Sequence, residues 1–241
     1  MNFQKITERI YYLPATEETD RPILGYIKGT KHSLMLDAGN SPAHVALYNA
    51  AREEMGFQTP DYVAITHWHW DHTYGMCAVE GKVIAHELTN QQLKIMASWK
   101  WTEEAMAERL QTGEEIEFCD NCIRLEYKDP GQIRVKTADI TFNGAITIDL
   151  GDIHCELIHI GGPHSKDSVA VYIPEEKVLF IGDAEGPDYY HNDGKYDKNK
   201  LQKFMEDLQE IDFEIYMMGH GTPDTKENTI KYLEEEISKL S

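Results

Sequence analysis

The chain has 241 residues, 41% of them hydrophobic and 27% charged, and this length can bury a substantial core within one compact domain. That share of apolar residues excludes a disordered chain. Because 42 acidic residues face 23 basic ones, the formal net charge is −19, which repels phosphate backbones and anionic membrane surfaces. We therefore expect neither a nucleic-acid partner nor a membrane partner.

The sequence predicts neither a membrane span nor a targeting segment. No stretch approaches the roughly 20 apolar residues of a membrane span, and the N-terminal segment mixes charged with apolar side chains, unlike a signal peptide. We expect a cytoplasmic location. Four cysteines are too few for a disulfide scaffold. Cys119 and Cys122 form a C-x-x-C pair that we interpret as reduced and partly buried, with a redox or metal role as the less favoured alternative.

In the first half of the chain, short apolar and β-branched runs alternate with helical patterns. Ser41 provides an N-cap and Pro42 a first-turn proline for a helix that ends at Gly56. A second helical pattern opens with a Thr-x-x-Gln capping box at Thr89 and Gln92. The predicted elements of this half are strands at 23–28, 33–36, 62–66 and 82–85, and helices at 42–55 and 89–110.

From Phe118 onward the pattern is typical of strands, and helices return near the C-terminus. The predicted strands are 146–150, 154–160, 168–173, 177–181 and 213–218, the predicted helices 199–210 and 225–240, and a hairpin joins the third and fourth of these strands. No linker rich in glycine or serine divides the chain, so we predict one domain over residues 1–241. Strands followed by helices in both halves favour two sheets covered by helices, although periodicity alone leaves a doubly wound sheet open.

Three histidines and one aspartate lie within six residues, directly after the apolar strand at 62–66. In an extended backbone the side chains at i, i+2 and i+4 point the same way, so His67, His69 and Asp71 can converge. A bend after Asp71 would turn His72 towards the same point. Neutral imidazole and carboxylate are ligands of zinc, iron and manganese. This segment therefore predicts a metal site, and the intervening Trp68 and Trp70 would point away from it.

Three further candidate ligands each follow an apolar strand and lie beside glycine: His164, Asp183 and His220. Glycine permits the sharp turns and close backbone approach that direct a short ligand into a cleft. Each of these loops is a weak signal alone, but four ligand-bearing loops in one chain indicate a shared site.

These motifs resemble the metallo-β-lactamase superfamily, whose signature is the H-x-H-x-D-H run, and the later His, Asp and His follow in the family's order. The resemblance implies a four-layer αβ/βα sandwich of two mixed β-sheets flanked by helices. It also implies two divalent metal ions, zinc in first place and iron or manganese as alternatives. His67, His69 and His164 would hold the first ion, Asp71, His72 and His220 the second, and Asp183 would bridge both, while Asp37 matches an early family motif and would orient a ligand.

Two positions indicate which branch of the family the chain resembles. His69 stands where the flavin-linked diiron members typically carry Glu, and Asp183 stands where the true β-lactamases typically place Cys or Ser. The resemblance thus implies a dinuclear hydrolase in which a metal-bridging hydroxide attacks a small ester, thioester, lactone or phosphoester. Asp71 and Asp183 would also offset part of the ions' charge. We therefore expect the catalytic residues to be Asp71, Asp183 and Tyr190.

Substrate contacts are less defined by the sequence. Tyr189 or Tyr190 could donate a hydrogen bond to a developing oxyanion, or the two could simply pack the loop after Asp183. Lys195, Lys198 and Lys200 are more typical of a solvated turn than of an anion site. The other histidines that we considered are interpreted as structural: His32, His44, His86, His154 and His159.

Several alternatives remain open at the level of sequence. An iron-dependent sulfur dioxygenase or oxidoreductase would use the same fold, and so would a nuclease, although the net charge argues against the latter. A metal-stabilised binding module is a non-enzymatic alternative. We expect a small-molecule substrate as the partner, and formation of a homodimer is left open.

Overall fold

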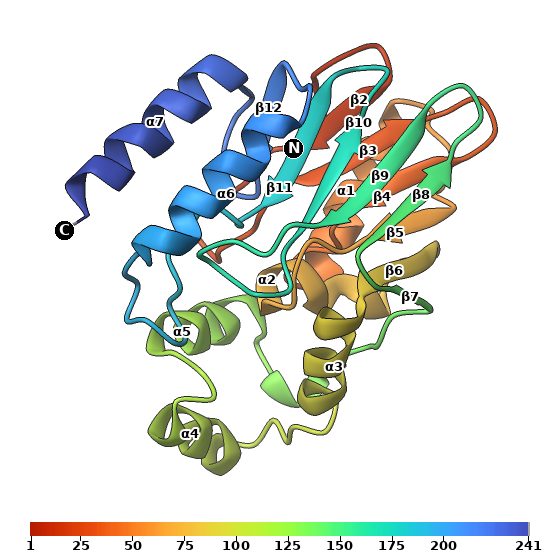
Figure 1. Ribbon diagram of the computed structural model, residues 1–241. Helices are drawn as coiled ribbons and strands as arrows, with labels where there is room; N and C mark the ends of the chain where they lie inside the picture. The colour runs from red at the N-terminus through yellow and green to blue at the C-terminus, as the bar shows by residue number, and fades with distance from the viewer. Residues whose placement is uncertain (241) are drawn as a thin grey trace.

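A computed structural model describes residues 1–240 (Figure 1). The chain forms two mixed β-sheets with helices on their outer faces. The first sheet contains, in spatial order, β1 (Gln4–Lys5), β2 (Ile10–Leu13), β3 (Leu24–Lys28), β4 (Ser33–Leu36), β5 (Tyr62–Ala64), β6 (Lys82–His86) and β7 (Ile140–Phe142). The second contains β13 (Asp224–Thr225), β12 (Ile215–Met218), β11 (Val178–Gly182), β10 (Val169–Ile173), β9 (His154–His159) and β8 (Ala145–Asp149).

Seven α-helices and two short 3-10 helices complete the described fold of residues 1–240. The α-helices are α1 (Pro42–Glu54), α2 (Trp70–Thr73), α3 (Glu87–Met96), α4 (Glu103–Thr112), α5 (Glu117–Glu126), α6 (Lys198–Glu210) and α7 (Lys226–Lys239). The 3-10 helices are Tyr74–Cys77 and Pro130–Gln132. Within this described part, no helix combines the length and apolarity needed to cross a bilayer.

The main core lies between the two sheets. In β10, Val169, Val171 and Ile173 join a buried cluster that also contains Leu34 and Leu36 of the first sheet. The alternate residues of the same strand pack in a second cluster with residues of α6 and α7, which explains why β10 is apolar throughout. Residues of α1 pack on the outer face of the first sheet. The layers are therefore helix, sheet, sheet and helix, as the resemblance implied.

The strand directions bring the ligand loops to one edge of the sandwich. Strands β4, β5 and β6 are parallel neighbours in the first sheet, and β11 and β12 are parallel neighbours in the second. The carboxyl ends of neighbouring parallel strands meet at the same edge. Asp37, residues 66–72, Asp183 and His220 follow β4, β5, β11 and β12, so this topology collects them from both sheets.

Several local predictions are confirmed. Pro42 is the first residue of α1, and the Ser41 side chain accepts a hydrogen bond from the backbone N–H of His44 at 3.1 Å. Gly56, just after this helix, has a φ of 67°, the left-handed conformation that favours glycine. Strands β10 and β11 form the predicted antiparallel hairpin.

The single helix predicted at 89–110 is wrong, because two helices, α3 and α4, occupy this region. The capping box is also wrong: α3 begins earlier, with His86 as its N-cap, and the Thr89 hydroxyl donates instead to buried Asp167 at 2.8 Å. The strand pattern expected from Phe118 is wrong for α5. There the buried residues Cys119, Cys122 and Ile123 follow helical spacing, and burial of this face selects the helix.

Candidate metal centre

The H-x-H-x-D-H segment lies between the end of β5 and the short helix α2. His67 and His69 lie in the connecting loop, and Asp71 and His72 lie in α2. Trp70 packs in a buried cluster with residues of α4 and α5. This buried side chain anchors the segment to the core. The Trp68 ring packs against the ring of His69, with 4.5 Å between centroids.

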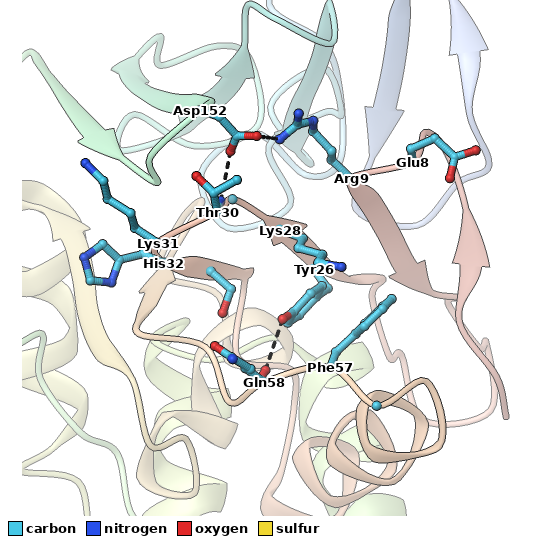
Figure 2. A pocket seen from close by; sticks show the side chains of 13 residues that line it. Glu8, Arg9, Tyr26, Lys28, Thr30, Lys31, His32, Phe57, Gln58 and Asp152 are labelled. Atoms are coloured by element: carbon cyan, nitrogen blue, oxygen red, sulfur yellow. Dashed lines mark hydrogen bonds and ion pairs between the residues drawn. The ribbon is translucent and has the colours of Figure 1, made fainter.

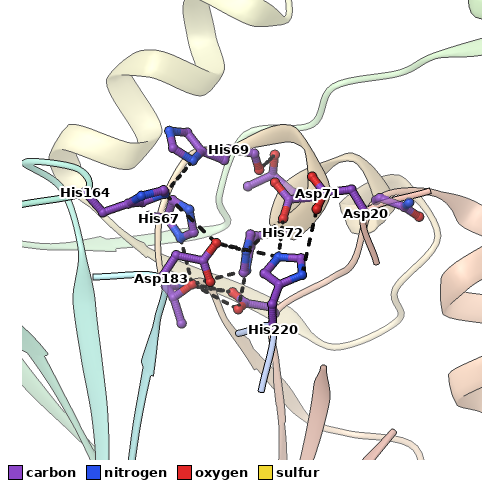
Figure 3. Close-up of polar contacts among 12 residues, drawn as sticks. Asp20, His67, His69, Asp71, His72, His164, Asp183 and His220 are labelled. Atoms are coloured by element: carbon purple, nitrogen blue, oxygen red, sulfur yellow. Dashed lines mark hydrogen bonds and ion pairs between the residues drawn. The ribbon is translucent and has the colours of Figure 1, made fainter. Parts of the chain in front are cut away.

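All seven predicted ligands come together in two groups (Figure 3). Within each group, one ligand atom per residue lies within 4.8 Å of the ligand atoms of the others. The first group is His67, His69 and His164, and the second is Asp71, His72, Asp183 and His220. The six ligands other than Asp183 thus fall into the two sets that the resemblance implied, and Asp183 lies with the second set. The bridging role of Asp183 stays a prediction.

Asp183 belongs to the second group and also approaches the first. Its Oδ2 atom is 3.4 Å from Nε2 of His72 and 3.6 Å from Nε2 of His220, both in the second group. The same oxygen is 4.0 Å from Nε2 of His164 in the first group. A carboxylate in this position can contact ions held by either group.

The chemistry of this cluster fits metal ions. Within the described chain, the buried atoms that lack a hydrogen-bond partner include His67 Nε2, His72 Nε2 and Asp183 Oδ1. His72 Nε2 lies 3.0 Å from Asp71 Oδ2, but not in the geometry of a hydrogen bond. A buried polar group without a partner costs about 1–3 kcal/mol. Cations among these atoms would satisfy them, and imidazole with carboxylate is a donor set for zinc, iron or manganese.

The outer nitrogens of two ligands are held by neighbouring groups. Nδ1 of His72 lies 2.8 Å from Oδ2 of Asp37, and Nδ1 of His164 lies 2.9 Å from the carbonyl oxygen of Pro187. Asp37 is fixed in turn by Thr66, whose backbone N–H donates to Oδ1 at 2.8 Å and whose hydroxyl donates to Oδ2 at 2.9 Å. Such contacts set the orientation of an imidazole ligand, so Nε2 of His72 and of His164 is directed at the cluster (Figure 3).

Gly219 makes room for the cluster. A Cβ atom at this position would lie 2.2 Å from Oδ1 of Asp183 and 2.9 Å from Cε1 of His72. Only glycine permits such a close approach of the backbone to these groups.

The electrostatics of the cluster favour cation binding. Burial lowers the pKa of His67 and His69 well below the usual value, so both are neutral and keep a free lone pair. Burial acts to lower the pKa of His220, but Asp183 and Asp71 outweigh it and raise that pKa to about 9. In the metal-free protein these carboxylates thus hold a proton on His220, and a bound cation would displace it.

The cluster opens into a cavity of about 530 Å³. Tyr189 and Tyr190 line this cavity, whereas Lys195, Lys198 and Lys200 do not. The cavity also contains residues that the sequence did not single out, among them Asp20, Ile116, Phe118, Glu185, Tyr196 and Tyr232. Asp20 comes from the loop between β2 and β3, and α5 and α7 contribute Phe118 and Tyr232. Their positions depend on long-range packing, for which no local sequence signal exists.

Tyr190 contributes its ring to the site, while its hydroxyl has another partner. The ring lies 5.0 Å from the ring of His69 between centroids, and the hydroxyl donates to Oε1 of Glu115 at 2.8 Å. In this structure Tyr190 is thus part of the cavity wall, with its hydroxyl hydrogen-bonded to Glu115. Its catalytic role stays a prediction.

Cys119 and Cys122 are free and largely buried, as expected. Burial raises the pKa of the Cys119 thiol well above its usual value, so the thiol that borders the cavity is unreactive.

A second cavity of about 530 Å³ lies at the opposite end of the first sheet, around the hairpin between β3 and β4 (Figure 2). Several of its polar groups are paired with protein partners, although Nδ1 of His32, which also lines the cavity, has no hydrogen-bond partner and lies 3.3 Å from Oδ2 of Asp61. Arg9 forms an ion pair with Asp152, Asp152 accepts the backbone N–H of Thr30 at 2.9 Å, and the Tyr26 hydroxyl donates to the carbonyl of Gln58 at 3.1 Å. Sequence motifs did not point to this cavity.

Comparisons with known proteins agree with this fold. The sequence profile of the Metallo-beta-lactamase superfamily matches residues 25–220. The chain therefore belongs to the metallo-β-lactamase superfamily, and it carries a His/Asp metal-binding cluster. No curated protein sequence matches the chain.

Solved structures show the same fold at low sequence identity. A metallo-beta-lactamase from Pontibacter korlensis is 19% identical, with a TM-score of 0.67 over 99% of both chains. The DIM-1 metallo-beta-lactamase is 17% identical, with a TM-score of 0.67 over 100% of this chain and 98% of that one. A stereoselective inverting sec-alkylsulfatase from Pseudomonas sp. is 14% identical, with a TM-score of 0.70 over 98% of this chain but only 41% of that one.

Proposed function

We propose that this protein is a dinuclear metal-dependent hydrolase that acts on a small ester, thioester, lactone or phosphoester. The observation that carries the proposal is the pair of adjacent ligand groups, with Asp183 of the second group close to His164 of the first and with buried ligand atoms that lack any partner in the described chain. A cluster kept only for folding would not need to open into a cavity large enough for a substrate.

Each of the two ions would have its own set of ligands. His67, His69 and His164 would hold one ion and Asp71, His72 and His220 the other, with Asp183 between them. We propose zinc, which this donor set suits. When bound, two such ions supply Lewis acidity, lower the pKa of a shared water to about 7 and polarise the oxygen under attack.

The protein's own residues prepare the site for this chemistry. Asp71 and Asp183 would offset part of the charge of the ions. Without ions, these carboxylates lie 3.0 Å from Nε2 of His220 and 3.4 Å from Nε2 of His72, respectively. Asp37 fixes the orientation of His72 by holding its Nδ1 atom. These contacts set the polar groups before substrate arrives, which is the condition for electrostatic stabilisation of a transition state.

Trp68 and Tyr190 form an aromatic wall beside His69. The Trp68 ring lies 4.5 Å from the His69 ring and 4.8 Å from the Tyr190 ring between centroids. This aromatic wall is held in place because Glu115 accepts a hydrogen bond from the Tyr190 hydroxyl. Substrate therefore approaches the ligand cluster from the open side of the cavity.

The test is hydrolysis of a panel of esters, thioesters, lactones and phosphoesters by zinc-loaded and chelated protein. We expect turnover by the loaded protein and loss on chelation. Asp183→Asn should reduce turnover to background while circular dichroism shows a folded protein. Asp152→Asn, a carboxylate at the opposite end of the sheet, serves as the matched control and should keep the activity. Equal turnover by metal-free protein, or iron-dependent oxygen uptake in place of hydrolysis, would refute the proposal.

A further inference from the structure

The cavity above the ligand cluster has no basic lining outside its histidines. Among residues 1–240, no lysine or arginine side chain borders it. Two arginines on adjoining segments have other partners. Arg21 pairs with Glu126 at 2.7 Å between Nη2 and Oε1, and the Arg109 guanidinium lies between Trp99 and Trp101, 4.6 and 4.8 Å from their ring centroids.

Carboxylates other than the ligands do border the cavity. Asp20 lies beside His220, with 3.8 Å between Oδ1 and Nδ1 (Figure 3). Glu185 is only 5% exposed, and its Oε2 atom accepts a hydrogen bond from the hydroxyl of Tyr216 at 2.6 Å. An anionic substrate group held against these walls, away from the ions proposed for the cluster, would lose its hydration without gaining a cationic side chain as a partner, which is unfavourable.

The mouth of the cavity is aromatic. Phe118 of α5, Tyr189 of the loop after β11 and Tyr232 of α7 all line it, and their exposed fractions are 59%, 53% and 43%. Exposed aromatic side chains that converge on one opening are a surface for apolar groups. Three different elements supply them, so the surface is a property of the fold and not of one loop.

We propose that the substrate of this site is an uncharged ester or lactone whose aryl or alkyl group lies against Phe118, Tyr189 and Tyr232, and that phosphoesters and other anionic esters are poor substrates. This inference rests on the proposed hydrolase function and narrows its substrate class. A cavity of about 530 Å³ is suited to a small molecule. The histidines of the cluster do not replace a basic side chain, because their lone pairs are committed to ligation.

The first test compares two phenyl esters of equal shape. The acyl chain of phenyl 6-methylheptanoate ends in an isopropyl group, and that of the monophenyl ester of adipic acid ends in a carboxylate. We expect kcat/KM to be at least about tenfold higher for the neutral ester, since an unpaired charge must be desolvated in the second complex. Equal or better turnover of the adipate ester would overturn the inference.

Two variants that each add a lysine test which surface the substrate chain contacts. Phe118→Lys places a cation at the mouth and should raise kcat/KM for the adipate ester several-fold relative to the neutral one. Leu125→Lys is the matched control, because Leu125 is 68% exposed on the same helix but does not line the cavity. The same response in both variants would contradict the assignment of Phe118 to the substrate surface.

Binding measured without turnover separates this inference from the hydrolase proposal. The corresponding anilides, 6-methylheptananilide and adipic acid monoanilide, can be titrated by calorimetry against zinc-loaded protein, in which the histidines of the cluster are ligands and carry no additional proton. Tighter binding of the neutral anilide supports the inference even if neither ester is hydrolysed, in which case only the hydrolase proposal fails. Equal or tighter binding of the monoanilide would overturn the inference even if both esters are hydrolysed.

Discussion

Two cavities of about 530 Å³ lie at opposite ends of this molecule, and their chemistry differs. At the end shown in Figure 2, Arg9, Asp152, Thr30 and Tyr26 satisfy their polar groups with protein partners. At the end shown in Figure 3, ligand atoms of the metal cluster are buried without partners. Volume alone does not distinguish the cavities.

The difference shows what marks a functional site in this fold. Folding normally pairs each buried polar group, because an unpaired one lowers stability. Such atoms occur elsewhere in the described chain too, including Nδ1 of His32 beside the opposite cavity. At the metal cluster several of them converge on one point among metal-type donors, His67 Nε2, His72 Nε2 and Asp183 Oδ1, and this convergence indicates a ligand from outside the chain. Variants at the two ends of the molecule test this contrast.

Metal binding should have the largest effect on stability. Ions that bind only the folded chain stabilise it by about 4 kcal/mol when free metal is 1,000 times its dissociation constant. Urea unfolding of zinc-loaded and chelated protein would measure this difference. His67→Ala should abolish most of it. A wild-type chain equally stable in both states would contradict the assignment of these histidines as ligands.

Gly219→Ala should disturb the cluster directly. The added Cβ would lie 2.2 Å from Asp183 Oδ1, so either the strand end or the carboxylate must move. We expect a loss of about 1–3 kcal/mol in stability, together with weaker zinc binding by calorimetry. Gly221→Ala is the matched control, since the nearest atom to its Cβ would be 3.4 Å away. Similar zinc affinities in the two variants would show that Gly219 is not needed for space.

The ligands of the metal end are largely predictable from sequence because their signal is local. His67, His69, Asp71 and His72 lie within six residues after an apolar strand, and the later ligands each follow a strand and adjoin glycine. Strand ends place such residues at one edge whatever the rest of the chain does. Recognition of the family supplied the division into two groups, which spacing alone did not establish.

The cavity walls were not predictable in the same way. Glu115, Phe118 and Asp20 reach the site through the packing of α4, α5 and the loop before β3, and no motif precedes them. The same packing decides that α5 is helical, against the strand pattern expected from Phe118. Long-range contacts determine these features, and a single sequence does not reveal long-range contacts.

Glu115 should make stability depend on pH. Burial raises its pKa from 4.5 to about 7, although the backbone N–H of Ile116 and the Tyr190 hydroxyl oppose this. The folded chain thus keeps a proton that the unfolded chain loses above about pH 4.5. The contribution of the protonated Glu115 carboxyl to the free energy of unfolding is therefore present below about pH 4.5 and is lost as the pH rises to about 7.

Glu115→Gln removes this dependence while keeping an oxygen for Tyr190. In urea unfolding of metal-free protein, the variant should match the wild type near pH 4 and exceed it by on the order of 2 kcal/mol at pH 8. Glu114→Gln, at the exposed neighbouring position, should leave the wild-type pH profile unchanged. A pH-independent difference for Glu115→Gln would contradict the buried, protonated carboxyl.

The smallest effect is expected at the opposite end of the molecule. Arg9 pairs with Asp152 and Glu176 on the surface, where solvent screens such contacts. Arg9→Ala should leave zinc content and hydrolysis rate unchanged and should shift the unfolding midpoint less than the preceding variants. Loss of hydrolysis in this variant would show that the two ends are coupled.

The central claim is that seven side chains from both sheets bind two cations. Anomalous diffraction from crystals of the zinc-loaded protein, recorded above and below the zinc absorption edge, tests it most directly. We predict two peaks, one among His67, His69 and His164 and the other among Asp71, His72, Asp183 and His220. A folded, zinc-saturated protein without a peak at this cluster would contradict the claim.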